Sequence, residues 1–159
     1  MTIEQAETVA ANTANTKENN DFQKAFKSKF FGILRWHQLD DLWAILKSKK
    51  DDGWYIYAVG EEPPTEKSSA AEVEMFIEKI DVLLRREHDE DYCGIVYAND
   101  TQNPSFIKVF DPNNIGTSCS VGQDAPLPGW IISKIAPINL PEAMKPTANR
   151  RRWWQKIFK

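Results

Sequence analysis

"SAAEVEMFIEKIDVLLRRE", residues 69–87, is the stretch that decides the fold. Ser69 and Glu72 have the spacing of a capping box, in which hydroxyl and carboxylate oxygens each accept a hydrogen bond from a free amide at a helix start. The apolar residues that follow recur at intervals of three and four and so share one helical stripe, which comprises Val73, Phe76, Ile77, Ile80, Leu83 and Leu84. The stretch predicts a long helix, about residues 70–87, whose stripe packs on a sheet.

Strands are predicted on both sides of this helix. Residues 54–60, "WYIYAVG", and 92–98, "YCGIVYA", are rich in aromatic and β-branched residues and apolar throughout, which indicates that both faces of each strand are covered. We therefore expect residues 54–60 to form a central strand and the two strands to be neighbours or nearly so. Residues 106–110 follow a short polar connection that suits an antiparallel hairpin, and residues 130–135 predict one more short strand.

The segment before these strands contains a second helix. Leu39, Leu42, Trp43 and Leu46 follow helical spacing, and His37 falls at or near the start of that helix. The apolar run at residues 30–36 fits either a strand or a helix end. The order of elements predicts an α+β fold: a single domain with a mixed, mostly antiparallel sheet of four to five strands packed against one or two helices.

Composition divides the chain into three parts. Residues 1–20 contain no aromatic residue and predict a flexible leader, residues 21–140 predict the α+β domain, and residues 141–159 predict a linker and a basic amphipathic tail. With 159 residues the chain suits one domain. The leader lacks the apolar run of a secretory signal, no stretch is long enough to span a membrane, and the chain has only two cysteines, so we expect a cytoplasmic protein.

The tail differs in charge from the rest of the chain. Residues 144–159 carry a formal charge of +6, and the remainder carries −9, because the whole chain carries −3. On a helix, the apolar side chains gather on one side and most cations on the other. We expect the tail to bind a surface through Arg150, Arg151, Arg152, Trp153, Trp154, Ile157 and Phe158. That surface is a protein partner, a second copy, the chain's own acidic body or an anionic membrane; nucleic acid is disfavoured by the acidic body.

The second candidate site is the 19-residue segment from Asp111 to Gly129, which has three Gly, three Pro and no periodicity. A loop this long inside a compact domain is often functional. We expect ligand contacts from Asp111, Asn113, Asn114 and Cys119. Cys119 would act as a nucleophile or redox thiol only if His37, His88 or a cation lay beside it. Otherwise it is a thiol without a role.

Metal and cofactor chemistry find little support. Residues 87–92, "EHDEDY", collect four acids and a histidine, yet their spacing matches no metal-binding loop, and a solvated connection is the simpler interpretation. The chain has no phosphate-binding loop, GxGxxG, HExxH, CxxC or GxSxG motif. We therefore predict no cofactor and no metal. The expected function is a non-enzymatic interaction or regulatory module that uses the tail and the 111–129 loop; the alternative is a small enzyme or ligand-binding protein that uses Cys119.

Overall fold

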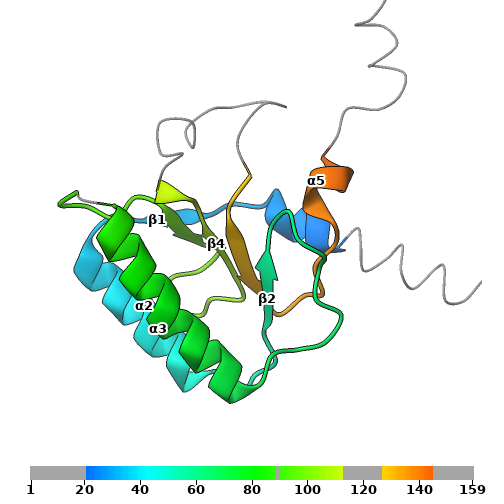
Figure 1. Ribbon diagram of the computed structural model, residues 1–159, viewed down its shortest axis with the longest axis horizontal. Helices are drawn as coiled ribbons and strands as arrows, with labels where there is room; N and C mark the ends of the chain where they lie inside the picture. The colour runs from blue at the N-terminus through cyan, green and yellow to red at the C-terminus, as the bar shows by residue number, and fades with distance from the viewer. Residues whose placement is uncertain (1–20, 89, 113–126, 145–159) are drawn as a thin grey trace, which may run out of the picture.

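A computed structural model describes residues 21–88, 90–112 and 127–144 of the chain (Figure 1). Residues 21–26 are helical. The elements that follow are β1 (Phe31–Ile33), α2 (Trp36–Ser48), β2 (Tyr55–Ala58), α3 (Ala70–Glu87), β3 (Val96–Ala98), β4 (Phe106–Val109), β5 (Trp130–Ser133) and α5 (Leu140–Ala143). The α+β class and the single domain are confirmed.

The five strands form one open sheet in the order β1-β3-β4-β5-β2, and every pair of neighbours is antiparallel. The hairpin of β3 and β4 was predicted and is confirmed. The prediction that residues 54–60 form a central strand beside residues 92–98 is wrong, because β4 and β5 lie between β2 and β3 and β2 is at an edge. Both faces of β2 are nevertheless covered, which explains its apolar sequence.

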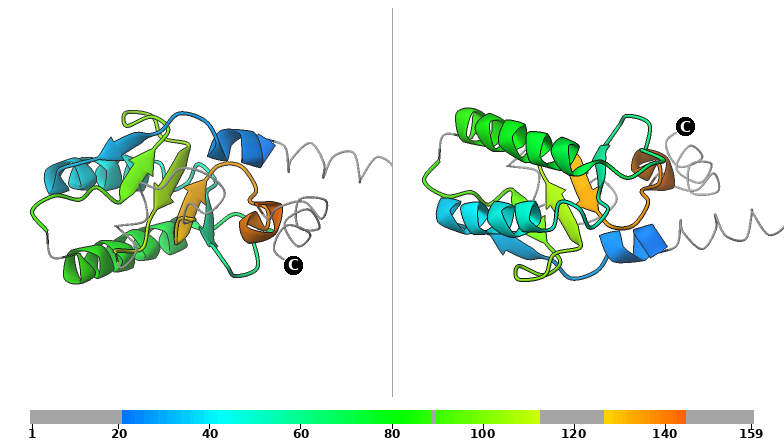
Figure 2. Two further views of the ribbon diagram at one scale, coloured as in Figure 1. Left: turned by 90° about the horizontal axis from the view of Figure 1, so that it is seen from above. Right: turned by 90° about the horizontal axis from the view of Figure 1, so that it is seen from below.

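The first face of the sheet carries the larger core. α2 and α3 pack side by side against it (Figures 1 and 2). From α3 the predicted stripe buries Val73, Ile77, Ile80 and Leu84, whereas Phe76 and Leu83 are only partly buried. Leu39, Leu42, Trp43 and Leu46 of α2 are buried as predicted. The two helices are joined by polar contacts as well: the indole N–H of Trp43 donates to Asp81 at 3.2 Å.

The second face of the sheet has a smaller core built from aromatic side chains. Phe22 of the 21–26 helix packs on Phe106 with ring centroids 5.3 Å apart, and Tyr57, Ile131 and Leu140 complete the buried cluster. The amide of Leu140 donates to the hydroxyl of Tyr57 at 3.1 Å, which ties α5 to β2. Figure 2 shows the 21–26 helix and α5 together, apart from the pair formed by α2 and α3.

The long helix begins and ends where the sequence indicates. The hydroxyl of Ser69 accepts from the amide of Glu72 at 3.2 Å, and the carboxylate of Glu72 accepts from the amide of Ser69 at 3.0 Å, so the capping box is confirmed. At the other end Arg85 and Arg86 lie in the last turn, where cations interact favourably with the helix dipole. The predicted leader lies outside the described residues, and so do the predicted linker and tail from residue 145 onward, whereas residues 141–143 belong to α5.

Candidate functional site

The free edge of β2 leaves the backbone of Ile56 available for hydrogen bonding. The amide of Val59 donates to the carbonyl of Gly129 at 2.9 Å, so the backbone of Val59 faces the side on which β5 lies. Tyr57 lies two residues earlier, and its backbone therefore faces β5 in the same way. In an antiparallel pair the alternate residues face away from the partner strand, so Ile56 and Ala58 face the edge. The carbonyl of Ala58 accepts from Glu61 at 3.0 Å. Within the described ranges Ile56 has no backbone hydrogen bond from outside the sheet.

The segment after β2, residues 60–68, runs beside this edge, and we call it the bracket. It turns away at Gly60, whose φ of 103° is a conformation that glycine adopts easily and other residues rarely do. It returns at Ser68, whose amide donates to the carbonyl of Trp54 at 2.7 Å. The bracket therefore touches the edge at both of its ends and bows outward opposite Ile56.

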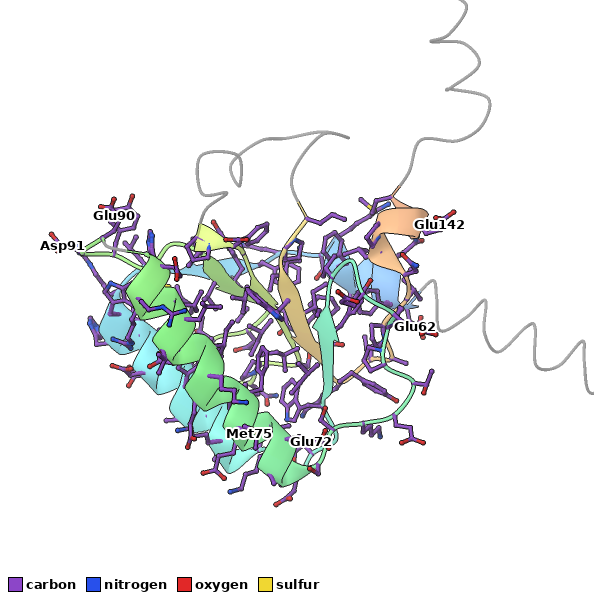
Figure 3. The ribbon with its side chains drawn as sticks, in the orientation of Figure 1. Glu62, Glu72, Met75, Glu90, Asp91 and Glu142 are labelled. Carbon is purple, nitrogen blue, oxygen red and sulfur yellow. The ribbon has the colours of Figure 1, made fainter. Side chains whose placement is uncertain are left out.

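A pocket of about 520 Å³ lies between β2, this bracket and the start of α3. We call it the β2 pocket. Its apolar walls come from three elements and comprise Ile56, Pro64, Met75 and Phe76. Met75 stands outside the buried stripe of α3 and is 55% exposed, which is unusual for a large apolar side chain on a polar helix face. Figure 3 shows Met75 and Glu72 at the N-terminal end of α3, beside the start of β2.

The rim of the β2 pocket carries two acids and two bases and belongs to an acidic segment of the chain. Glu66 and Glu72 lie on it together with Lys67 and Lys79. Residues 60–79, which include most of the lining, contain six acidic and two basic side chains, a formal charge of −4. Hydrogen bonds from the backbone and then the side chain of Ser69 lower the pKa of Glu72, so this carboxylate stays ionised at neutral pH. The pocket thus offers apolar walls, a free backbone edge and a negative field, which together suit a basic segment with a large apolar side chain.

A second pocket, of about 360 Å³, lies at the opposite edge of the sheet. It is formed by β1, α2 and the turn between β3 and β4, and it is lined by Gly32, Gln38, Asp41, Leu42, Thr101 and Gln102, among others. We call it the β1 pocket. Asp41 is the one charged residue in its lining, beside uncharged polar and apolar groups.

Lys108 is the one described side chain whose pKa shift is large. It lies in a row across the second face, where Gly32, Tyr97, Lys108, Ile131 and Tyr57 are successive partners in the register. Its ammonium donates to the carbonyl of Phe26 at 2.7 Å and lies 4.0 and 3.8 Å from the ring centroids of Phe26 and Phe30. Burial lowers its pKa to about 8, while the carbonyl and the rings favour the cation. These contacts hold the end of the 21–26 helix on the sheet, a structural role.

His88 and Cys93 are also structural. The ring of His88 is buried between Trp36 and Tyr92, with centroid distances of 5.8 and 5.7 Å, and its Nε2 lies 2.7 Å from the carbonyl oxygen of Cys93. The thiol of Cys93 is fully buried, and burial raises its pKa. His37 is exposed at the second position of α2. Among the residues whose positions are described, no group of three or more His, Cys, Asp or Glu side chains is placed to hold a metal ion.

Most of the residues predicted as sites lie outside the described part of the chain. Asp111 is half-buried just after β4. Asn113, Asn114, Cys119 and the whole tail from residue 145 fall outside, so their roles stay predictions. The β2 pocket was missed by sequence reasoning. One signal for it was available: Met75 is a large apolar residue that does not fit the buried stripe of its helix.

Comparisons with known proteins add no assignment: no protein-family model matches the chain, and searches of curated proteins and of solved structures found no match. None of the helices in the described ranges combines the length and apolarity needed to cross a bilayer.

Proposed function

We propose that the chain is a non-enzymatic interaction module that binds a protein partner through its basic aromatic C-terminal segment, with the 111–129 segment as a second contact surface. The observation that carries this proposal is the division of charge and aromatic residues. Residues 144–159 hold +6 and two tryptophans, whereas the rest of the chain holds −9. Aromatic residues beside arginine often dominate the free energy of binding at protein interfaces.

α5 and Met144 fix the point from which the C-terminal segment starts. α5 ends at Ala143, and Met144 packs against the cluster that contains Tyr57 and Leu140. The tail therefore starts from a fixed point on the surface of the domain. The proposal includes a cytoplasmic location, which rests on the scarcity of cysteines in the sequence.

The test compares the full chain with a chain that ends at Thr147. Each is immobilised and exposed to lysate of the source cell, and captured proteins are identified and then purified for a binding titration. We expect a partner that is retained by the full chain and lost on truncation. Its Kd should rise about tenfold or more for Trp153→Ala and by less for Lys159→Ala, since a terminal charge contributes little.

Raising the salt concentration should weaken this binding, because exposed charges are screened over about 8 Å at physiological ionic strength. Titration with anionic vesicles separates the membrane alternative: a blue shift of tryptophan fluorescence in the full chain, absent from the truncated chain, would replace the protein partner by a lipid surface. A partner retained equally by both chains would show that the tail is not the contact surface.

A further inference from the structure

We propose that the β2 pocket is the docking site of the chain's own C-terminal segment, with Trp153 or Trp154 inserted between the bracket and α3. The tail would then be held on its own domain until a partner displaces it. Release of the tail by a partner rests on the proposed function. Docking of the tail does not, and it can be tested on the purified chain.

The first argument is the shape of the pocket. The bracket contacts Trp54, just before β2, and Ala58, at the end of β2, so there is no room for a long added strand. The space opposite Ile56 instead suits one large side chain, which would contact Pro64, Met75 and Phe76. The outward amide and carbonyl of Ile56 supply a donor and an acceptor at the pocket wall, and an indole N–H needs such an acceptor when it is buried.

Charge is the second argument. The segment that forms the bracket and the start of α3 carries −4, and the tail carries +6. Among the described residues, Glu74 is paired with Lys50 at 3.0 Å, whereas Glu66 forms none of the ion pairs. Glu66 is thus available to an arginine next to the inserted ring. Among the residues that line the pocket, Lys67 and Lys79 balance Glu66 and Glu72, so the attraction comes from the further acids of residues 60–79.

Reach is the third argument, and it favours the chain's own tail over a second copy. Met144 packs against the buried cluster that contains Tyr57 of β2, so the tail starts near that strand, on the face of the sheet opposite to α2 and α3; the free edge of β2 borders the pocket. The nine residues from Lys145 to Trp153 span at most about 30 Å when extended. A short connection that spans the distance to the pocket gives an effective concentration on the order of millimolar, which a second copy at cellular concentrations would not match.

The β1 pocket is a poorer candidate. It lies at the other edge of the five-stranded sheet, four strand spacings or about 19 Å from β2. Only Asp41 among its lining residues carries a charge. A basic tail that starts near β2 would have to cross the sheet to reach this pocket, whose lining offers one carboxylate where the β2 pocket offers two.

The experiment uses the chain that ends at Thr147 and a fluorescently labelled synthetic peptide of residues 148–159, followed by anisotropy. The described domain includes every strand of the sheet and extends only to Met144, so the truncated chain retains the pocket and its supports. We expect saturable binding that weakens with salt. The peptide with Trp153→Ala and Trp154→Ala should bind about tenfold or more weakly.

Two matched variants locate the site on α3. Met75→Lys places a cation in the pocket wall and should weaken peptide binding about tenfold or more. Val82→Lys makes the same charge change at another exposed apolar position of the same helix, 61% exposed and outside the pocket, and should leave binding within about twofold of the unchanged chain. Because both positions are exposed, neither variant should disturb folding, which circular dichroism checks.

Several outcomes would overturn the proposal. The first is a peptide that does not bind, and the second is an equal loss of peptide affinity for Met75→Lys and Val82→Lys. The third is a full-length chain that sediments as a concentration-dependent dimer, which would assign the tail to a second copy. Failure of the proposed function looks different. In that case the peptide binds the β2 pocket as described, but no protein partner is lost on truncation, and the tail is a part of its own domain.

Discussion

The amide of Ser68 donates to the carbonyl oxygen of Trp54 at 2.7 Å, and this bond fixes the far end of the bracket against the edge of β2. The near end is fixed at Gly60, and the two together create the β2 pocket. Trp54 is itself fully buried, with its indole N–H donating to the carbonyl of Lys49 at 2.8 Å. The pocket therefore rests on the core of the domain rather than on a loose loop.

Replacing Gly60 with Ala should destabilise the domain by about 1–2 kcal/mol, because its φ of 103° is strained for a residue with a Cβ. A Cβ at this position would meet no atom within 4 Å, so the cost is one of backbone conformation and not of packing. Gly129→Ala is the control, since a Cβ there meets only ordinary contacts at 3.7 Å and beyond. Urea unfolding of both variants is the measurement; equal stabilities would contradict the role of Gly60.

Ile80 is the central contact of α3 with the sheet, and truncating it to Ala should cost about 2–5 kcal/mol. It is only 3% exposed and belongs to the larger core. Val82→Ala, two residues further along and 61% exposed, should change the free energy of unfolding by less than about 0.5 kcal/mol. A small effect at Ile80 in chemical denaturation would mean that the helix does not pack as described.

The pH dependence of stability should reveal the burial of Lys108. Its folded pKa of about 8 lies below the ordinary value of 10.5, so between these values the unfolded chain binds more protons and stability from this group rises with pH. Below pH 8 the group contributes no slope. After allowance for the exposed part of the side chain, we expect a gain on the order of 1–2 kcal/mol across the window.

Lys108→Met provides the reference for this measurement, because it keeps an unbranched side chain against Phe26 and Phe30 without the titrating amine. The free energy of unfolding of the unchanged chain should rise relative to the variant between pH 7 and 10. A constant difference between the two proteins over this range would show that the lysine titrates near its ordinary value, with the rings and the carbonyl of Phe26 offsetting its burial.

The two cysteines should differ in reactivity. Cys93 is fully buried and its pKa is raised by that burial, so a thiol reagent should modify it slowly in the folded protein. We expect Cys119 to react faster. The rate of modification in the native chain and in Cys119→Ser separates the two thiols, and equal protection of both would remove the 111–129 segment as a candidate site.

How far the sequence predicts this structure depends on the kind of contact. The start of α3 depends on a local contact, because Ser69 and Glu72 lie only three residues apart in the sequence. The predicted bounds of this helix, about residues 70–87, agree with the structure. The order of strands was not, since the apolar pattern of residues 54–60 reports how many faces of a strand are covered and not how many strands lie beside it. Ile56 faces one core and Tyr57 the other, although β2 is at the edge.

The β2 pocket could not be predicted for a related reason. It depends on the φ of Gly60, on the hydrogen bond between Ser68 and Trp54 and on the approach of α3, and these bring together residues that are separate in the sequence. Only the exposed Met75 carried a local sign of it. The charge division between tail and body, by contrast, needs no structure and was evident from composition.

The most direct test of tail docking is a comparison of amide chemical shifts in the full chain and in the chain that ends at Thr147. If the tail occupies the β2 pocket, the shift differences should be largest at Ile56, Ser68, Met75 and Phe76. They should be small at Gln38 and Thr101, which line the β1 pocket. Differences confined to the residues just before the truncation, with none at Ile56 or Met75, would contradict docking of the tail in the β2 pocket.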